Sequence, residues 1–184
     1  MIPSPKIPRR RLTTRRALLA AASAAAVTGL AVGPVAVSAN NDPHRQFLPA
    51  GPIDLVGYCS FTVHVEFPVD REYGTITTEP DGSTLIKVTG ALFNTFTNEA
   101  TGKSVYVNAS GPGTFLISPD GSTVTTDGQG QSVDLAPNLT AFGFPSNLVE
   151  NAGPVHYVQA SGFGTMTSFS GHINVLTDIC AALS

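Results

Sequence analysis

A five-residue turn sequence, Pro-Asp-Gly-Ser-Thr, occurs twice in this chain, at residues 80–84 and 119–123. Proline presets φ at the first turn position, aspartate hydrogen-bonds to its own backbone, and glycine accepts the left-handed conformation that closes a tight hairpin. Runs rich in Thr, Val, Ile and Phe flank both copies. The repeat therefore predicts two β-hairpins, and Asn-Glu-Ala-Thr-Gly at residues 98–102 predicts a third.

Short β segments fill most of the chain after residue 57. Phe61, Val63, Val65 and Phe67 alternate with polar residues, which is the period-two pattern of a half-buried strand. Only the Ala-rich leader and residues 178–183 have a helical pattern. Further strands are expected at 73–78, 84–90, 91–97, 104–109, 114–118, 123–126, 132–135, 155–163 and 166–176. These runs predict an all-β antiparallel fold of eight to ten strands.

Residues 1–39 differ in composition from the rest of the chain. They hold six of the ten Lys and Arg residues and none of the thirteen Asp and Glu residues. A basic start, an Ala-rich run over 17–32 and small residues before position 40 follow the order of a cleavable signal peptide. A membrane anchor is the alternative, but a spanning helix needs about 20 strongly apolar residues. We expect cleavage after Ala39 and a secreted, extracytoplasmic protein without membrane insertion after cleavage.

Two arginines, Arg15 and Arg16, directly precede the apolar run of the leader. This arrangement fits the twin-arginine export signal of bacteria, with an ordinary Arg-rich secretory leader as the alternative. Residues 40–57, which are polar, contain Pro and Gly and lack periodicity, are expected to form a flexible N-terminal arm. A single all-β domain is expected over residues 58–184.

The chain has two cysteines, Cys59 and Cys180. An exported chain meets oxidising conditions, where an even number of cysteines favours a disulfide over two free buried thiols. Because such a bond would join the first and last strands, it suits a ring, and closure also removes exposed strand edges. We therefore expect an antiparallel closed barrel, with a β-sandwich as the alternative.

The disulfide also predicts a strand pairing. If the strand after Cys59 lies antiparallel beside the strand before Cys180, Glu66 is expected opposite His172 and Val65 opposite Ile173. This register, shifted by one residue from direct opposition of the cysteines, places polar side chains on one face. It requires Cys180 to lie in a terminal turn just past its strand.

The domain over residues 40–184 is strongly acidic. It carries four basic and thirteen acidic residues, which gives a net charge of −9. So few cations, none of them clustered, leave no electrostatic footprint for nucleic acid or an anionic membrane. The expected partner is a protein or a small apolar ligand.

Residues 136–154 interrupt the strand pattern with three prolines and several apolar side chains, Phe142 and Phe144 among them. Long segments of this kind are often lids or binding loops. The two phenylalanines are therefore candidates for a ligand mouth. The alternative is a flap that packs its aromatic side chains on the core.

The sequence lacks the common catalytic and metal-binding motifs. It has no Gly-x-Ser-x-Gly, His-Glu-x-x-His, Cys-x-x-Cys, P-loop or EF-hand sequence, and no metal or cofactor is expected. His64, Glu66 and His172 lie on polar strand faces and are weak candidates for a catalytic site. The alternative is that all three are solvated.

From Leu92 to the C-terminus the chain resembles small exported single-disulfide proteins of actinobacteria that have no known function. The resemblance depends on Asn98–Val105, Gly111-Pro112-Gly113, the turn at Asp120-Gly121 and the segment 178–183 with its cysteine. These are turns and a cysteine pair. They imply a scaffold and assign no catalytic residue.

Two functions remain open from the sequence. The first is a secreted, non-enzymatic binding or interaction module, with an apolar ligand held in the barrel. The second is a small barrel enzyme of the cyclase or isomerase type with polar residues in its lumen. The lumen distinguishes them, because an enzyme needs an open interior lined by His, Glu or Tyr side chains.

Overall fold

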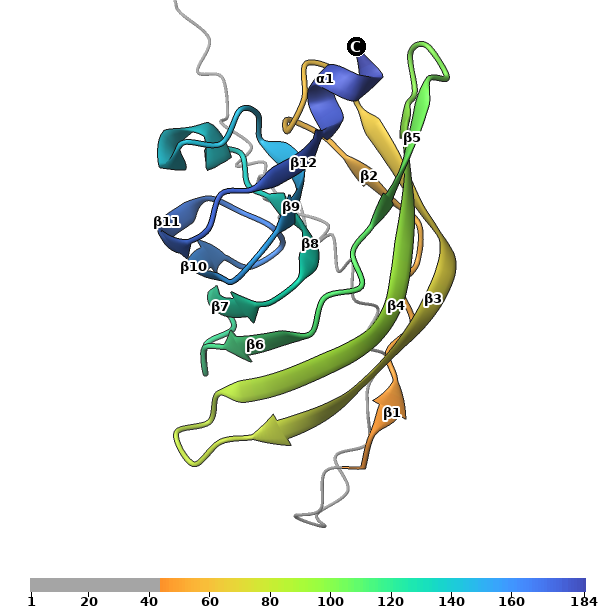
Figure 1. Ribbon diagram of the computed structural model, residues 1–184. Coiled ribbons are helices and arrows are strands. Elements are labelled where there is room, and N and C mark those ends of the chain that lie inside the picture. Colours follow the sequence, from red (N-terminus) through yellow and green to blue (C-terminus); the bar gives the residue numbers. More distant parts are fainter. Residues whose placement is uncertain (1–43) are drawn as a thin grey trace, which may run out of the picture.

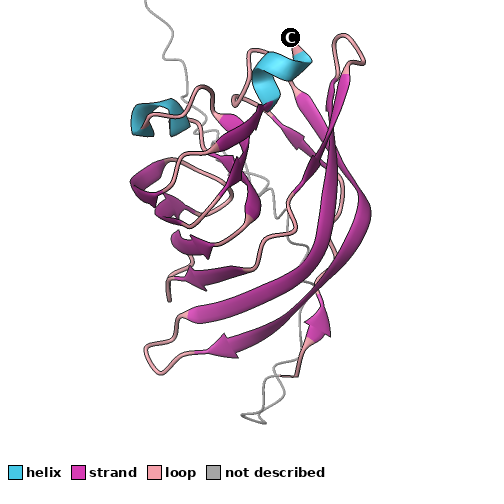
Figure 2. Cartoon of the chain, viewed as in Figure 1, coloured by secondary structure: helices cyan, strands magenta, loops and turns pink. Residues whose placement is uncertain are grey.

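The computed structural model describes residues 44–184 (Figure 1). The predicted signal peptide, its twin-arginine sequence and its cleavage site lie outside the described residues. Antiparallel strands make up most of the described chain, as Figure 2 shows. The all-β prediction is confirmed.

The strands form two antiparallel sheets. The larger has the order β1-β3-β4-β6-β7-β10-β11, with β2 also beside β3 and β5 beside β4; the smaller has the order β12-β9-β8. The strands are β1 (Gln46–Phe47), β2 (Ile53–Leu55), β3 (Val63–Thr78), β4 (Thr84–Asn98), β5 (Ser104–Asn108), β6 (Gly113–Ile117), β7 (Thr123–Gly128), β8 (Gln131–Leu135), β9 (Leu148–Ala152), β10 (Val155–Ala160), β11 (Met166–Gly171) and β12 (Val175–Asp178). The two helices are a 3-10 helix, η1 (Leu139–Phe142), and the C-terminal α1 (Ile179–Leu183).

Neither sheet closes on itself, so the expectation of a closed barrel is wrong and the two sheets fit a β-sandwich better. The physical reason is that the chain turns corners between the sheets. It leaves the larger sheet between β7 and β8, returns between β9 and β10, and leaves again between β11 and β12. Strands that switch sheets at such corners interrupt the hydrogen-bond ladder that a barrel would need.

A long bent hairpin of β3 and β4 forms one side of the molecule, opposite β8, β9 and β12 (Figure 1). Its register runs from Val63 opposite Asn98 to Thr78 opposite Thr84 and shifts between Glu66 and Val69. Gly90 on β4 has φ +151°, and a Cβ there would lie 2.1 Å from a backbone oxygen of β3. These irregularities let two continuous strands bend, where the sequence pattern predicted four short ones.

Both copies of the repeated turn close hairpins as predicted, β3 to β4 and β6 to β7. In the first, Gly82 has φ +88° and its backbone N–H donates to Glu79 O at 2.9 Å. In the second, Gly121 has φ +70° and donates to Ser118 O at 2.8 Å. The aspartate of each copy accepts hydrogen bonds from the following serine.

The N-terminal arm is described from residue 44 onward. There it wraps against the domain, because β1 and β2 both pair with β3 and the side chains of Leu48 and Leu55 are buried. The C-terminal segment is helical, as expected, and Asp178 caps it by accepting a hydrogen bond from Ala181 N at 3.1 Å.

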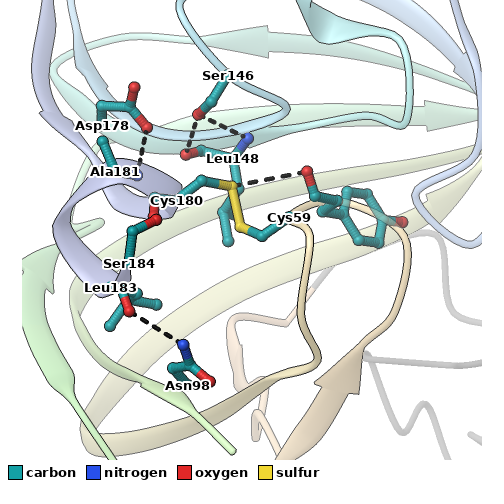
Figure 3. Close-up of a disulfide and its surroundings, with 10 residues drawn as sticks. Cys59, Asn98, Ser146, Leu148, Asp178, Cys180, Ala181, Leu183 and Ser184 are labelled. Atoms are coloured by element: carbon teal, nitrogen blue, oxygen red, sulfur yellow. Dashed lines mark hydrogen bonds between the residues drawn. A yellow bond between two sulfur atoms is a disulfide. The ribbon is translucent and has the colours of Figure 1, made fainter. Parts of the chain in front are cut away.

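The predicted disulfide is present between Cys59 and Cys180, whose Cα atoms lie 5.4 Å apart (Figure 3). Beside it, Asn98 Nδ2 at the end of β4 donates to Leu183 O at 3.0 Å. The strand pairing inferred from the disulfide is wrong, since β12 pairs with β9 and not with β3. Cys59 lies in the loop between β2 and β3 and Cys180 in α1, so the bond joins a loop to a helix and imposes no strand register.

The core has three clusters of buried side chains. One, beside the disulfide, joins β2, β3 and β4 to β9 and α1. A second joins η1 and β9 to β10 and β11. A third contains Ile86 and Val88 from the N-terminal half of β4. The interior is not completely filled between these clusters, and the candidate site lies there.

Candidate functional site: an interior apolar cavity

A cavity of about 220 Å³ lies in the interior. Strands of both sheets line it, β2, β3, β4, β6, β7 and β10 from the larger and β8 from the smaller. Most of its wall is aliphatic or aromatic: Leu48, Ile53, Leu55, Val65, Phe67, Ile86, Val88, Leu92, Phe96, Phe115, Val133, Leu135, Val155 and Phe163. A pocket of this character is the usual form of a small-molecule site.

The alternation of β4 explains how one strand supplies so much of the wall. Side chains of successive strand residues point to opposite faces. The even-numbered residues Ile86, Val88 and Phe96 are buried and line the cavity. Lys87 and Thr89, between them, are exposed on the outer face.

The loop between β10 and β11 adds an aromatic side chain to the wall. Phe163 lines the cavity and has φ +58°, the only positive φ among the non-glycine residues that the structure describes. Tyr58, beside the disulfide, donates from its hydroxyl to Phe163 O at 2.7 Å. This hydrogen bond therefore ties the loop between β10 and β11 to the loop between β2 and β3, which carries Tyr58 and Cys59.

Asn94 is a polar residue in the apolar stripe of β4. Its side chain is 5% exposed and lines the cavity between the positions of Leu92 and Phe96. Its Oδ1 is buried and has no hydrogen-bond partner among the described residues. Leaving a buried amide oxygen without a hydrogen-bond partner costs about 1–3 kcal/mol of folding stability. This oxygen is therefore an acceptor at the cavity wall that a bound molecule could satisfy.

Glu72 on β3 is the second unpaired polar group of the cavity. No hydrogen bond to its carboxyl oxygens is found in the part of the chain that the structure describes. Burial, and to a lesser degree the negative charge of Asp70, raise the pKa of Glu72 to about 7. Its carboxyl group therefore changes charge near neutral pH.

Asp134 and Tyr157 are two further polar residues of the cavity wall. Asp134 already has hydrogen-bond partners, and Tyr157 is buried. Asp134 accepts from Asn151 Nδ2 at 3.0 Å and from Ser132 Oγ at 3.2 Å, and burial raises the pKa of its carboxyl group. Burial, with a contribution from the charge of Asp134, raises the pKa of the Tyr157 hydroxyl. Both line the cavity, so its polar lining is acidic or neutral.

The structure does not place the predicted catalytic candidates at this cavity. His64 points outward from β3 and its Nδ1 lies 2.6 Å from Asp54 Oδ1. Glu66 is exposed two residues further along β3, opposite Thr95. His172 is exposed at the corner between β11 and β12, so the three residues do not form one site.

His64 takes part in a different cluster. Ligand atoms of Asp54, His64 and Glu99 all lie within 4.8 Å of one another. The hydrogen bond that His64 makes to the Asp54 carboxylate is the largest cause of the raised pKa of His64. Both carboxylates are exposed, and the His64–Asp54 hydrogen bond accounts for the arrangement without an ion.

A second Asp–His pair lies on the outer face of the larger sheet. His156 Nδ1 lies 2.7 Å from Asp127 Oδ1, and Ser170 lies directly opposite His156 on β11. These are the residue types of an acyl-transfer triad. However, His156 is 50% exposed and makes no hydrogen bond to Ser170 in the described structure, so the nucleophile is not activated. Sequence reasoning missed Asp127, His156 and Ser170 because they are far apart in the chain and match no motif.

Phe142 and Phe144, the predicted ligand mouth, lie in and beside the second core cluster. The ring of Phe144 meets that of Phe169 edge-on, with centroids 5.0 Å apart. Neither residue is among those that line the cavity. Both phenylalanines therefore pack at the core, as the alternative of a packed flap expected.

Comparisons with known proteins found no match among protein-family models, curated proteins or solved structures. The resemblance to exported actinobacterial proteins thus stays a prediction. Within residues 44–184, no helix has the length and apolar character required to cross a membrane.

Proposed function

We propose that this protein is a secreted binding module that holds a small apolar molecule in its interior cavity. The observation that carries the proposal is the unpartnered Oδ1 of Asn94 in an otherwise apolar wall. Buried polar atoms of folded proteins are nearly always hydrogen-bonded, and an exception calls for an explanation. A ligand with a polar group would supply the missing partner.

The size of the cavity supports this proposal. An apolar cavity of roughly 150 Å³ in another protein stays dry and binds benzene, and this one has about 220 Å³. It can therefore take a molecule somewhat larger than a benzene ring. The predicted export signal places that ligand outside the cytoplasm, as part of the same proposal.

A titration with 1-octanol tests the proposal, using the side-chain amide resonances of Asn94 and the melting temperature as readouts. We expect saturable binding that moves the Asn94 amide signals and raises the melting temperature, because a ligand that binds only the folded state stabilises it. Val88→Phe, which fills the cavity from β4, should weaken binding at least tenfold. Thr95→Phe, on the outer face of the same strand, is the matched control and should bind as the wild type does.

No saturable binding by the folded protein would refute the proposal. Equal affinities of the Val88→Phe and Thr95→Phe variants would also refute it, because the ligand would then lie outside the cavity.

A second function, acid–base catalysis within the cavity, is favoured by one observation. Glu72 has a pKa of about 7 and lines the apolar cavity, and a general acid or base works best when its pKa is close to the working pH. The test is to incubate a small-molecule extract with the wild type and with Glu72→Gln and to compare the products by mass spectrometry. A compound converted by the wild type alone supports catalysis, and identical profiles count against it.

A further inference from the structure

We infer that the ligand of the cavity is an apolar amine with a second polar group. Its nitrogen binds the Glu72 carboxylate, its apolar body lies along β4, and a hydrogen-bond donor at its far end pairs with Asn94 Oδ1. This inference rests on the proposed binding function and adds the chemical class of the ligand. It excludes the fatty-acid type of ligand that an apolar cavity would otherwise suggest.

The charged groups at the cavity wall are all of one sign. Glu72 and Asp134 line it, and none of the lining residues that the structure describes is Lys, Arg or His. A carboxylate ligand would therefore bring a charge into an apolar space with no cation to pair with it. An unpaired buried charge is strongly unfavourable, whereas an ammonium group beside a carboxylate is paired.

Of the two carboxyl groups, Glu72 is the one free to bind. Asp134 already accepts hydrogen bonds from Asn151 and Ser132. Asp70, next to Glu72 along the inner face of β3, accepts from Ala50 N at 2.7 Å and from Glu72 N at 3.2 Å. The backbone C=O of Glu72 accepts a hydrogen bond from Leu48 N. The carboxyl oxygens of Glu72 have no hydrogen-bond partner among the described residues.

The register gives the approximate length of the ligand. Glu72 lies opposite Gly90, and Asn94 follows Gly90 by four residues on the same face of β4. At about 3.3 Å per residue the two positions are roughly 13 Å apart along the strand. The apolar side chain of Leu92 lies between them and lines the cavity. A molecule with its nitrogen at one end, a chain of several carbons and a hydrogen-bond donor at the other end fits this stripe.

The charge of the whole domain favours the same class of ligand. Residues 40–184 carry four basic and thirteen acidic side chains. A net negative potential attracts cations and repels anions during association. An amine that is protonated outside the cell approaches such a surface more readily than a carboxylate does.

A matched series of probes tests the inference with the native, disulfide-bonded protein at pH 8. Octylamine, 1-octanol and octanoate have the same chain and differ in the head group. We expect octylamine to bind at least tenfold tighter than octanoate, with 1-octanol between them. A hydrogen-bonded charge pair is worth more than a neutral hydrogen bond.

Glu72→Gln should reduce octylamine binding about tenfold and change 1-octanol binding less than twofold. Glu66→Gln, on the outer face of the same strand, is the control and should change neither. If Glu72→Gln fails to fold, the order of the three probes on the wild type still decides.

The outcomes separate the two proposals. If none of the three probes binds, the proposed function fails. If all three bind with equal affinity, or if octanoate binds tightest, the cavity is a binding site and the inference of an amine is overturned. An unchanged affinity of Glu72→Gln for octylamine would also overturn it.

Discussion

Asn151 donates a hydrogen bond from Nδ2 to Oδ2 of Asp134 at 3.0 Å, and both side chains are at most 1% exposed. The same Nδ2 donates to His172 O at 3.1 Å, and Oδ1 accepts from Asn174 N at 2.7 Å. One amide therefore joins β8, β9 and the corner between β11 and β12. Because Asp134 lines the cavity, this amide also fixes the wall that faces the long hairpin.

Asn151→Ala should destabilise the fold by roughly 3 kcal/mol, because it leaves several buried polar atoms, including Oδ2 of Asp134, without their hydrogen-bond partner. Urea unfolding of the oxidised protein measures this. Asn174→Ala is the matched control, since that side chain is exposed, and its effect should stay within about 0.5 kcal/mol. Equal effects of the two substitutions would show that the buried amide has no special role.

The disulfide closes most of the domain into one covalent loop, since its cysteines are 121 residues apart in the sequence. Replacing both with alanine should lower the free energy of unfolding by roughly 2–5 kcal/mol, mainly because the unfolded chain regains conformational freedom. Chemical denaturation of the double variant tests this. Wild-type protein reduced with dithiothreitol should unfold at a similar denaturant concentration, and a double variant as stable as the oxidised wild type would contradict the prediction.

Local patterns predicted the strands and turns well, and they did so for local reasons. The two Pro-Asp-Gly-Ser-Thr copies determine their hairpins through their own φ preferences and side-chain hydrogen bonds. Closure of the sheet depends on where the chain turns corners, such as Gly153-Pro154 between β9 and β10, and such corners have no periodic signature. The alternation of strands is the same in a barrel and in a sandwich, so the pattern could not separate them.

The candidate site was only partly visible in the sequence. Asn94 occupies an inward position between Leu92 and Phe96, and a polar residue in an apolar stripe is a signal that pattern reading can find. Glu72 fell between two expected strands, because the bend of β3 conceals its continuity. His64 and Glu66 stood out by residue type alone, although their face of the strand is the outer one.

Export is a prediction of the leader sequence and is tested separately from the fold. Secreted protein should have the mass of a chain that begins at Asn40, and Arg15→Lys with Arg16→Lys should block secretion if the twin-arginine route is used. Undiminished secretion of this double variant would indicate the ordinary route. A mature species that retains Arg15 and Arg16 would contradict the signal peptide itself.

Glu72 should make the stability of the folded protein depend on pH in an unusual direction. Its pKa is about 7 in the folded state, where burial is the main cause, and near 4.5 in the unfolded chain. Between these values the folded state binds more protons than the unfolded state, so the contribution of this group to stability falls as the pH rises from about 4.5 to 7 and then levels off. Glu72→Gln removes this contribution, so the stability of the variant relative to the wild type should increase between pH 4.5 and 7.

Urea unfolding at several pH values measures this difference in stability, with Glu66→Gln as the control that keeps the wild-type profile. A difference between wild type and Glu72→Gln that does not change with pH would show that the carboxyl group is solvated in the folded state and not held in the apolar cavity.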